Sequence, residues 1–362
     1  MAISKFFGFR RKAANTFFHA SSSLTNKNYQ EARRRIREVA KSQAERLSLA
    51  NLKLTTLPPE LFRLTHLQSL NLSNNQLQEL PTEIGQLTEL EYLYLDHNQL
   101  RSLPAEIDRL RKLLWLDLSS NQLSFLPSEI GHLTELELLF ARSNQLECLP
   151  PEIGKLTNLQ ALDLSTNQLT ELPTEIANLA NLSGLYLTYN QLAEFPRPIF
   201  QLTNLSLLAL NINRISILPS QIGGLTKLHT LLLGGNQLQK LPSSIGQLFG
   251  LQKLSLSGNP LQELPPEIGS LTELKYLNLS RTLIKELPVE ISHLTQLEQF
   301  DLYENYYLEE IPEPVFEREP ADMIRLILAW QQAKRSQTVV EKTKVLSSEP
   351  ELVKSRELAI AV

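Results

Sequence analysis

The sequence predicts an α/β solenoid, in which short parallel strands and short helical segments stack in one row. Three observations predict it: a strict 23-residue period, a Leu-x-Leu alternation in each copy, and twelve of the 20 prolines in a single column of the repeat. Hydrophobic residues make up 42% of the 362 residues and charged residues 20%, so the chain can bury a core. A unit this short cannot bury its apolar face alone, and neighbouring copies must therefore stack.

The repeat follows the pattern LxxLxxLxLxxNxLxxLPxxIxx. A partial copy covers Leu47 to Arg63, and twelve repeats run from about residue 44 to about residue 318. Complete copies begin at Leu64, Leu87, Leu110, Leu133, Leu156, Leu179, Leu202, Leu225, Leu248, Leu271 and Leu294.

Each part of the repeat predicts one local structure. Alternation in Leu70-Asn71-Leu72 predicts a short strand with its leucines on the core side. Asn75 follows where the chain must turn, and its amide can satisfy backbone groups in a ladder of stacked asparagines. Leu-Pro then ends the pairing and begins a short helix or 3₁₀ segment. Leu52 and Thr282 interrupt the asparagine column, and we expect local weak points there.

The two ends of the array require caps because terminal repeats expose their core. Apolar residues at helical spacing predict an N-terminal capping helix over residues 26–46 and a C-terminal one over residues 319–335, with the array over 47–318 between them. An extra residue between Asn305 and Ile311 predicts a bulge in the last repeat. Residues 336–362 are polar and of mixed charge, which predicts a disordered tail.

Residues 1–25 form a separate segment with two interpretations. They contain four bases, five phenylalanines and no acid. This composition is typical of a membrane-surface anchor or an organelle-targeting segment, whereas a disordered tail is the simpler interpretation because the amphipathic pattern is imperfect.

Charge and cysteine content limit the function classes. Residues 1–46 carry 11 Lys and Arg against 3 Asp and Glu, whereas residues 47–330 carry 18 against 32. The acidic array disfavours binding of nucleic acid, which requires clustered Lys and Arg. Cys148 is the one cysteine, so no intramolecular disulfide can form, and we expect a reducing, cytoplasmic location. No apolar run approaches the roughly 20 residues that span a bilayer.

The repeat resembles the leucine-rich repeat family, and within it the 23-residue LPxxIxxL type of Ras-binding scaffold proteins, plant Ras-group repeat proteins and many bacterial proteins. The resemblance covers about three quarters of the chain. It implies a horseshoe with a concave parallel β-sheet of about 12 strands, helical or 3₁₀ segments on the convex side, and ligand binding mostly on the concave face. A small GTPase or a signalling enzyme is the partner that this resemblance implies.

The motifs of catalysis are missing from the sequence. There is no GxxxxGK[ST], HExxH, CxxC or GxSxG, and the six histidines lack metal-ligand spacing. We therefore predict no enzyme activity, no cofactor and no metal. One acidic column has two interpretations, a solvated edge that favours the start of each short helix or a site for a basic partner. Its members are Glu60, Glu83, Glu106, Glu129, Glu152, Glu175, Glu267 and Glu290.

The strand residues that point away from the core carry the candidate site. Successive strands lie about 4.8 Å apart, so equivalent residues of neighbouring repeats are neighbours in space. Repeats three to seven then present a strip of aromatic and apolar residues with interspersed acids, centred on Trp115 and Phe140, which is typical of a protein interface. The candidate partner-binding residues are Tyr92, Tyr94, Asp96, Trp115, Asp117, Leu138, Phe140, Arg142, Asp163, Tyr186 and Tyr189.

Two functions remain open from the sequence. The first is a non-enzymatic scaffold or adaptor, active in signal transduction, that binds a protein partner on the concave face. The second is a membrane-peripheral tether attached through the basic segment 1–25. The sequence indicates no oligomeric state.

Overall fold

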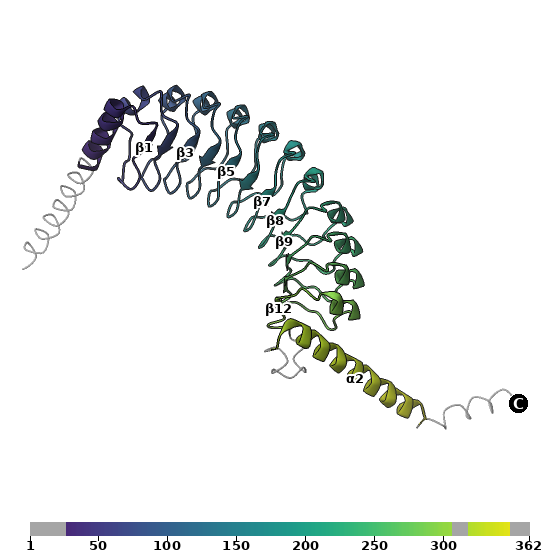
Figure 1. The fold of residues 1–362 in the computed structure, drawn as a ribbon. Coiled ribbons are helices and arrows are strands. Elements are labelled where there is room, and N and C mark those ends of the chain that lie inside the picture. Colours follow the sequence, from purple (N-terminus) through teal and green to yellow (C-terminus); the bar gives the residue numbers. More distant parts are fainter. Residues whose placement is uncertain (1–26, 306–317, 348–362) are drawn as a thin grey trace, which may run out of the picture.

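The computed structural model describes residues 27–305 and 318–347. The described chain forms one open arc, with twelve parallel strands on its inner, concave side and short 3₁₀ segments on its outer, convex side (Figure 1). The strands pair in chain order, from β1 to β12, and the register advances by one repeat of 23 residues at each pair, as in Trp115 opposite Tyr92. The predicted α/β solenoid is confirmed.

Each strand has three residues and each 3₁₀ segment five. The strands are β1 (Arg46–Ser48), β2 (Ser69–Asn71), β3 (Tyr92–Tyr94), β4 (Trp115–Asp117), β5 (Leu138–Phe140), β6 (Ala161–Asp163), β7 (Gly184–Tyr186), β8 (Leu207–Ala209), β9 (Thr230–Leu232), β10 (Lys253–Ser255), β11 (Tyr276–Asn278) and β12 (Gln299–Asp301). The 3₁₀ segments are η1 (Pro59–Arg63), η2 (Thr82–Gln86), η3 (Ala105–Arg109), η4 (Ser128–His132), η5 (Pro151–Lys155), η6 (Thr174–Asn178), η7 (Arg197–Gln201), η8 (Ser220–Gly224), η9 (Ser243–Gln247), η10 (Pro266–Ser270) and η11 (Val289–His293).

Alternation along each strand separates the core from the concave surface. In β4 the middle residue, Leu116, is fully buried, whereas Trp115 and Asp117 on either side of it are half-buried and face outward. On the convex side Ile130 of η4 is fully buried as well. Leucine and isoleucine therefore fill the space between the sheet and the 3₁₀ segments, and the outward-facing strand residues are free to vary.

Asparagines form a continuous buried ladder behind the sheet. Asn121 donates from Nδ2 to the carbonyl oxygens of Leu95 in the preceding repeat and Leu118 in its own, both at 3.0 Å. Its Oδ1 accepts the backbone N–H of Leu100 at 2.9 Å. The residue before it, Ser120, has φ of 55°, which turns the chain away from the strand. One side chain thus satisfies backbone groups of two repeats that no strand pairing reaches.

Thr282 occupies the ladder position between Asn259 and Asn305. It is buried, and its Oγ1 lies 3.0 Å from the carbonyl oxygen of Leu279 and 2.6 Å from Oδ1 of Asn305. A threonine cannot supply the two bonds that an asparagine makes to the preceding repeat. We expect Thr282→Asn to raise the free energy of unfolding by about 1 kcal/mol, because it restores these bonds. Urea unfolding followed by circular dichroism measures the change, and a less stable variant would refute the prediction.

A helix whose described residues are 27–42 covers the first repeat. Ala32 and Ile36 of this helix are buried against the core, and Arg33 Nε donates to Glu60 of η1 at 3.0 Å. The helix is shorter than the predicted 26–46, because Gln43 takes a positive φ of 51° and Arg46 already belongs to β1. The Glu45 carbonyl already accepts N–H groups of the second repeat, which commits this stretch to the sheet.

A long helix, α2 (Pro320–Ser347), covers the other end (Figure 1). Its buried residues include Met323, Ile324 and Ile327. The helix extends twelve residues beyond the predicted end at 335, so the assignment of residues 336–347 to a disordered tail is wrong. The reason is visible in the sequence, because no Gly or Pro interrupts the chain between Pro320 and Pro350. Within the described part of the chain no helix is both long and apolar enough to span a bilayer.

Some predictions concern residues outside the described ranges. The basic segment 1–25, the bulge between Asn305 and Ile311 and the last part of the tail, 348–362, are among them.

Candidate functional site

The strand register brings the predicted site residues into rows on the concave face. One row contains Tyr92, Trp115 and Leu138, and the next contains Tyr94, Asp117, Phe140, Asp163 and Tyr186. All eight are half-buried, so each still presents surface to solvent. The rows exist because every strand has the same three-residue length and the same offset from its neighbour.

Three aromatic rings pack together at the centre of these rows. The ring centroids of Trp115 and Phe140 lie 5.3 Å apart with planes tilted by 48°, and those of Trp115 and Tyr94 lie 5.9 Å apart at 46°. Tilted pairs at this separation match the electrostatics of aromatic rings and fix their positions. The Nε1 atom of Trp115 is buried and has no hydrogen-bond partner among the described residues. We call Tyr94, Trp115 and Phe140 the aromatic cluster.

Asp117 lies within the aromatic cluster, with Tyr94 and Phe140 opposite it on the two neighbouring strands. Its Oδ1 accepts the backbone N–H of Ser119 at 2.9 Å. Burial raises the pKa of the Asp117 carboxyl, the bonds from Ser119 act against this, and the nearby charge of Asp96 raises it further. Burial, followed by the charges of Tyr92 and Asp117, also raises the pKa of the Tyr94 hydroxyl.

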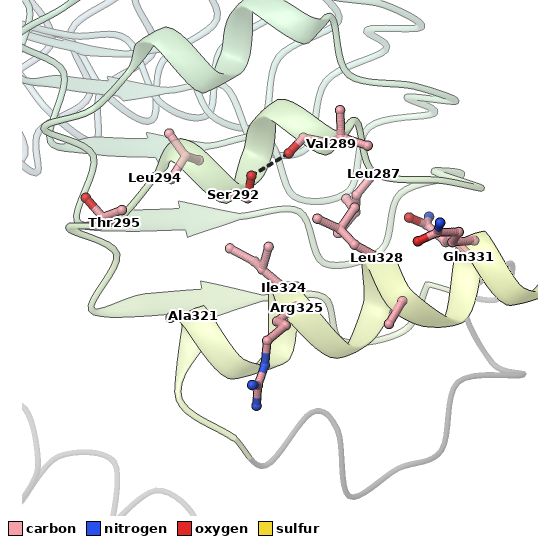
Figure 2. A pocket seen from close by; sticks show the side chains of 12 residues that line it. Leu287, Val289, Ser292, Leu294, Thr295, Ala321, Ile324, Arg325, Leu328 and Gln331 are labelled. Carbon is pink, nitrogen blue, oxygen red and sulfur yellow. Dashed lines mark hydrogen bonds between the residues drawn. The ribbon is translucent and has the colours of Figure 1, made fainter.

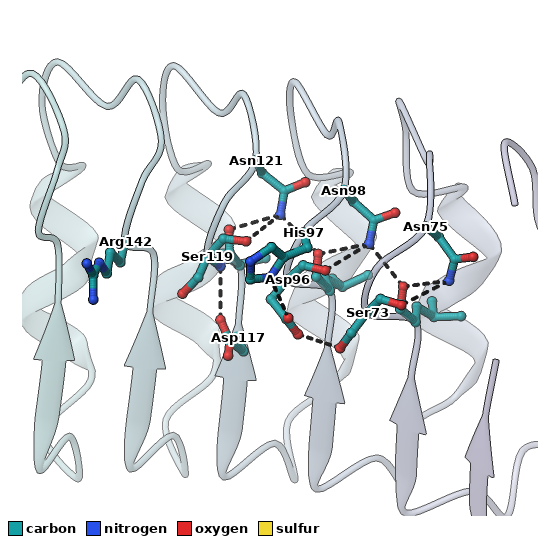
Figure 3. A network of polar contacts seen from close by, with 12 residues as sticks. Ser73, Asn75, Asp96, His97, Asn98, Asp117, Ser119, Asn121 and Arg142 are labelled. Atoms are coloured by element: carbon teal, nitrogen blue, oxygen red, sulfur yellow. Dashed lines mark hydrogen bonds and ion pairs between the residues drawn. The ribbon is translucent and has the colours of Figure 1, made fainter. Parts of the chain in front are cut away.

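A polar network lies beside the cluster, where the concave strands end (Figure 3). The two oxygens of the Asp96 carboxylate contact different groups, the Ser73 hydroxyl on one side and His97 Nδ1, at 2.9 Å, on the other. Arg142 lies two strands farther along the same row and is exposed. Sequence reasoning missed Ser73 and His97, although Ser73 precedes Asp96 in the same column of the repeat and His97 is the next residue in the sequence.

Tyr189 is separate from the aromatic cluster. It lies in the turn after β7, at φ of 59°, and is 58% exposed. Among the described residues, neither Tyr189 nor Tyr186 forms a ring contact with the cluster. The structure thus places ten of the candidate residues along three rows of the concave face and Tyr189 at their edge.

The other candidate features offer little chemistry. No group of three or more His, Cys, Asp or Glu side chains among the described residues is arranged to hold a metal ion. Cys148 is exposed. The acidic column lies in the first turn of the 3₁₀ segments, where Glu60 pairs with Arg33 of the N-terminal helix. Its two interpretations both remain predictions.

A cavity of about 690 Å³ lies between α2 and η11 (Figure 2). It is at the α2 end of the arc, far from β3 and β5 (Figure 1). Ile324 and Leu328 of α2 face Leu287 and Leu294 of the array across it. The described residues that line it include one charged side chain, Arg325, and no acid. This mostly apolar lining is typical of a packing contact between α2 and the repeat array.

The raised pKa of Asp117 predicts a pH-dependent stability effect. Because the folded chain holds this proton more tightly than the unfolded chain, stability falls as pH rises through the folded-state pKa and stays lower above it. Asp117→Asn cannot ionise and keeps the Oδ1 acceptor, so we expect its melting temperature at pH 7 to exceed that of the wild type, by on the order of 1 °C. The difference should be smaller at pH 4. Thermal unfolding by circular dichroism tests this, and a variant that is less stable at pH 7 would contradict it.

Comparison with known proteins identifies the repeat. A family model described as a leucine-rich repeat region matches residues 82–168 and 151–235, and one described as leucine rich repeat matches residues 42–100 and 249–306. A leucine-rich repeat protein of Leptospira interrogans is 39% identical over 72% of this chain and 79% of that chain, with a TM-score of 0.52. The chain belongs to the leucine-rich repeat family. No curated protein matches it.

Other solved leucine-rich repeat structures share the arc. Internalin InlF of Listeria monocytogenes is 24% identical, with 73% of this chain and 82% of that chain covered and a TM-score of 0.60, and this likeness shows the fold alone. The Arabidopsis receptor kinase HAESA, solved with the peptide hormone IDA and the co-receptor SERK1, is 29% identical with a TM-score of 0.64. That match covers 74% of this chain and 47% of the chain in that structure. Leucine-rich repeat arrays of this shape thus include a receptor solved with a peptide hormone.

Proposed function

We propose that this leucine-rich repeat protein is a non-enzymatic interaction scaffold that binds a protein partner on the concave face of β3 to β7. The observation that carries the proposal is the aromatic cluster, three adjacent rings on an outward face that the core does not need. Aromatic residues packed at the centre of a surface patch are the usual hot spots of protein interfaces. HAESA, a family relative, is solved with a peptide ligand, which supports a polypeptide as the partner class.

The cluster also has a stability cost that favours a binding role. Asp117 lies half-buried among aromatic rings, where burial raises its pKa, and Trp115 has a buried N–H without an acceptor. A residue selected only for stability would avoid both conditions, and such conflicts are concentrated at functional sites.

A pull-down from the native host lysate tests the proposal. The wild type is compared with the double variant Trp115→Ala/Phe140→Ala, and captured proteins are identified by mass spectrometry. We expect at least one protein to be captured by the wild type and lost with the double variant. Identical sets of captured proteins would exclude the cluster as the interface.

The finer parts of this function are proposals from resemblance and composition. The resemblance to Ras-group repeat proteins favours a small GTPase or a signalling enzyme as the partner, with a role in signal transduction. The one cysteine, exposed Cys148, suits the reducing cytoplasm. The acidic excess of residues 47–330 disfavours nucleic acid as a ligand.

A second candidate function is a membrane-peripheral tether. Four bases and five phenylalanines without an acid in residues 1–25 favour it, because anionic lipid attracts such segments. Sedimentation with liposomes that contain anionic lipid is compared between the full chain and a chain lacking residues 1–25. Loss of binding on truncation supports the tether, and unchanged binding argues against it.

A further inference from the structure

The aromatic cluster surrounds a carboxylate that the chain itself does not neutralise. Asp117 lies between Tyr94 and Phe140 on adjacent strands and two residues after Trp115 on its own strand. Among the described residues, the ion pairs of this protein involve other groups, and none includes Asp117. A half-buried carboxylate with rings on three sides is stabilised by a cation, through charge and through the faces of the rings.

The surrounding concave face has the matching charge. Along the outward positions of β3 to β6 and the second residue after each strand, the acids are Asp96, Asp117 and Asp163, and the base is Arg142. Asp163 repeats the arrangement of Asp117, because its Oδ1 accepts the backbone N–H of Ser165 at 2.8 Å and its neighbours in the row are Phe140 and Tyr186. Acids and rings thus alternate along the row, which suits an extended basic segment.

The molecule shows elsewhere that this sheet spacing allows a cation to reach a ring. On β10 and β11, Lys253 Nζ lies 4.7 Å from the centroid of the Tyr276 ring, one strand away in the same row. A cation located over Asp117 would have Tyr94 and Phe140 at the same strand spacing on both sides. A planar guanidinium suits this position best, since it stacks on rings and donates several hydrogen bonds to a carboxylate.

We propose that Tyr94, Trp115, Asp117 and Phe140 form a receptor for one arginine side chain from an extended basic segment of the protein partner. This inference rests on the proposed function and specifies the chemistry of its ligand. The Oδ1 atom of Asp117 accepts the backbone N–H of Ser119, and the guanidinium N–H groups donate to the remaining acceptor positions of the carboxylate. The rings pack along the aliphatic stem and over the charged plane.

A titration with a small probe tests the inference without knowledge of the partner. The chain has two tryptophans, so the variant Trp330→Phe assigns the Trp115 indole N–H signal in a ¹⁵N–¹H spectrum. The probes are N-acetyl-arginine amide and N-acetyl-citrulline amide, which has a similar shape without the charge. We expect saturable shifts of the Trp115 signal with the arginine probe, and at least about tenfold weaker binding of the citrulline probe.

Two aspartate variants complete the test. Asp117→Asn is expected to weaken the arginine probe about tenfold. Asp301→Asn is the matched control. Asp301 occupies the same position in β12 as Asp117 in β4, and its Oδ1 accepts the backbone N–H of Tyr303 at 2.9 Å. No aromatic residue lies opposite Asp301 on β11. This variant should leave the affinity unchanged. Equal binding of both probes, or an unchanged affinity in Asp117→Asn, would overturn the inference.

The pull-down separates this inference from the proposed function. If a partner is lost with Trp115→Ala/Phe140→Ala and kept with Asp117→Asn, the result supports the proposed scaffold function and refutes the arginine receptor. If the arginine probe binds as expected and the double variant still captures every partner, the proposed interface fails, and the inference about its partner fails with it.

Discussion

Replacing Asn144 by alanine is expected to destabilise the array by about 3 to 5 kcal/mol, because a buried polar group left without a partner costs about 1 to 3 kcal/mol and each of two further lost hydrogen bonds about 1 kcal/mol. The Nδ2 group of Asn144 donates to the carbonyl oxygens of Leu118 at 2.9 Å and Ala141 at 3.1 Å, and its Oδ1 accepts the N–H of Leu123 at 3.0 Å. Alanine leaves the buried N–H of Leu123 unpaired. The carbonyls of Leu118 and Ala141 each lose one bond and keep one, from Asn121 and Asn167, both at 3.0 Å.

Urea unfolding and amide hydrogen exchange together measure this effect. Contacts in a solenoid are between neighbouring repeats, so exchange should accelerate most around β4 to β6. Asn158→Ala is the matched control, because Asn158 is exposed and makes one bond between repeats, to the Thr134 carbonyl at 3.0 Å. We expect the control to lose less than about 0.5 kcal/mol. Equal losses in the two variants would show that the ladder is not what joins the repeats.

The double variant Trp115→Ala/Phe140→Ala should weaken partner binding about 100-fold, or about 2.7 kcal/mol, as truncation of central aromatic hot spots does. The centroids of the two rings lie 5.3 Å apart, and Trp115 is the largest outward side chain of its row. Both are half-buried and point away from the leucine core, so the array should stay folded. Isothermal titration with a partner obtained from the pull-down measures the affinity.

A second double variant controls for the loss of aromatic surface. Phe125→Ala/Phe249→Ala removes two rings that are 49% and 62% exposed and lie outside the concave strands. Its affinity should equal that of the wild type. An equal loss in the two double variants, or unfolding of the concave one by circular dichroism, would remove the support for a hot spot at Trp115.

The fold could be predicted because the sequence repeats each local pattern ten to twelve times. The Leu-x-Leu alternation, the asparagine before the turn and the proline before the 3₁₀ segment each act within a few residues, and the 23-residue period fixes which residues become neighbours. The rows of Tyr94, Asp117 and Phe140 follow from this register alone. The ends were predicted less well because no repeat constrains them, and the length of α2 depended on the absence of Gly and Pro up to Pro350.

The chemistry of the site required side-chain geometry. Sequence columns place Asp96 beside Ser73 but do not show that the Ser73 hydroxyl contacts its carboxylate, or that His97 contacts the other oxygen. The columns also do not show that burial raises the pKa of the Asp117 carboxyl, or that Arg142, one strand farther along, is exposed. These features depend on rotamers and on how far each ring covers its neighbour.

Photo-crosslinking from the concave face tests the central claim most directly. The photoreactive residue p-benzoylphenylalanine replaces Phe140 in one variant and the exposed Phe249 in another, so both changes extend an existing aromatic ring. After irradiation with a partner from the pull-down, we expect a covalent adduct from position 140 and none from position 249. An adduct from position 249 alone would contradict a concave interface centred on Trp115 and Phe140.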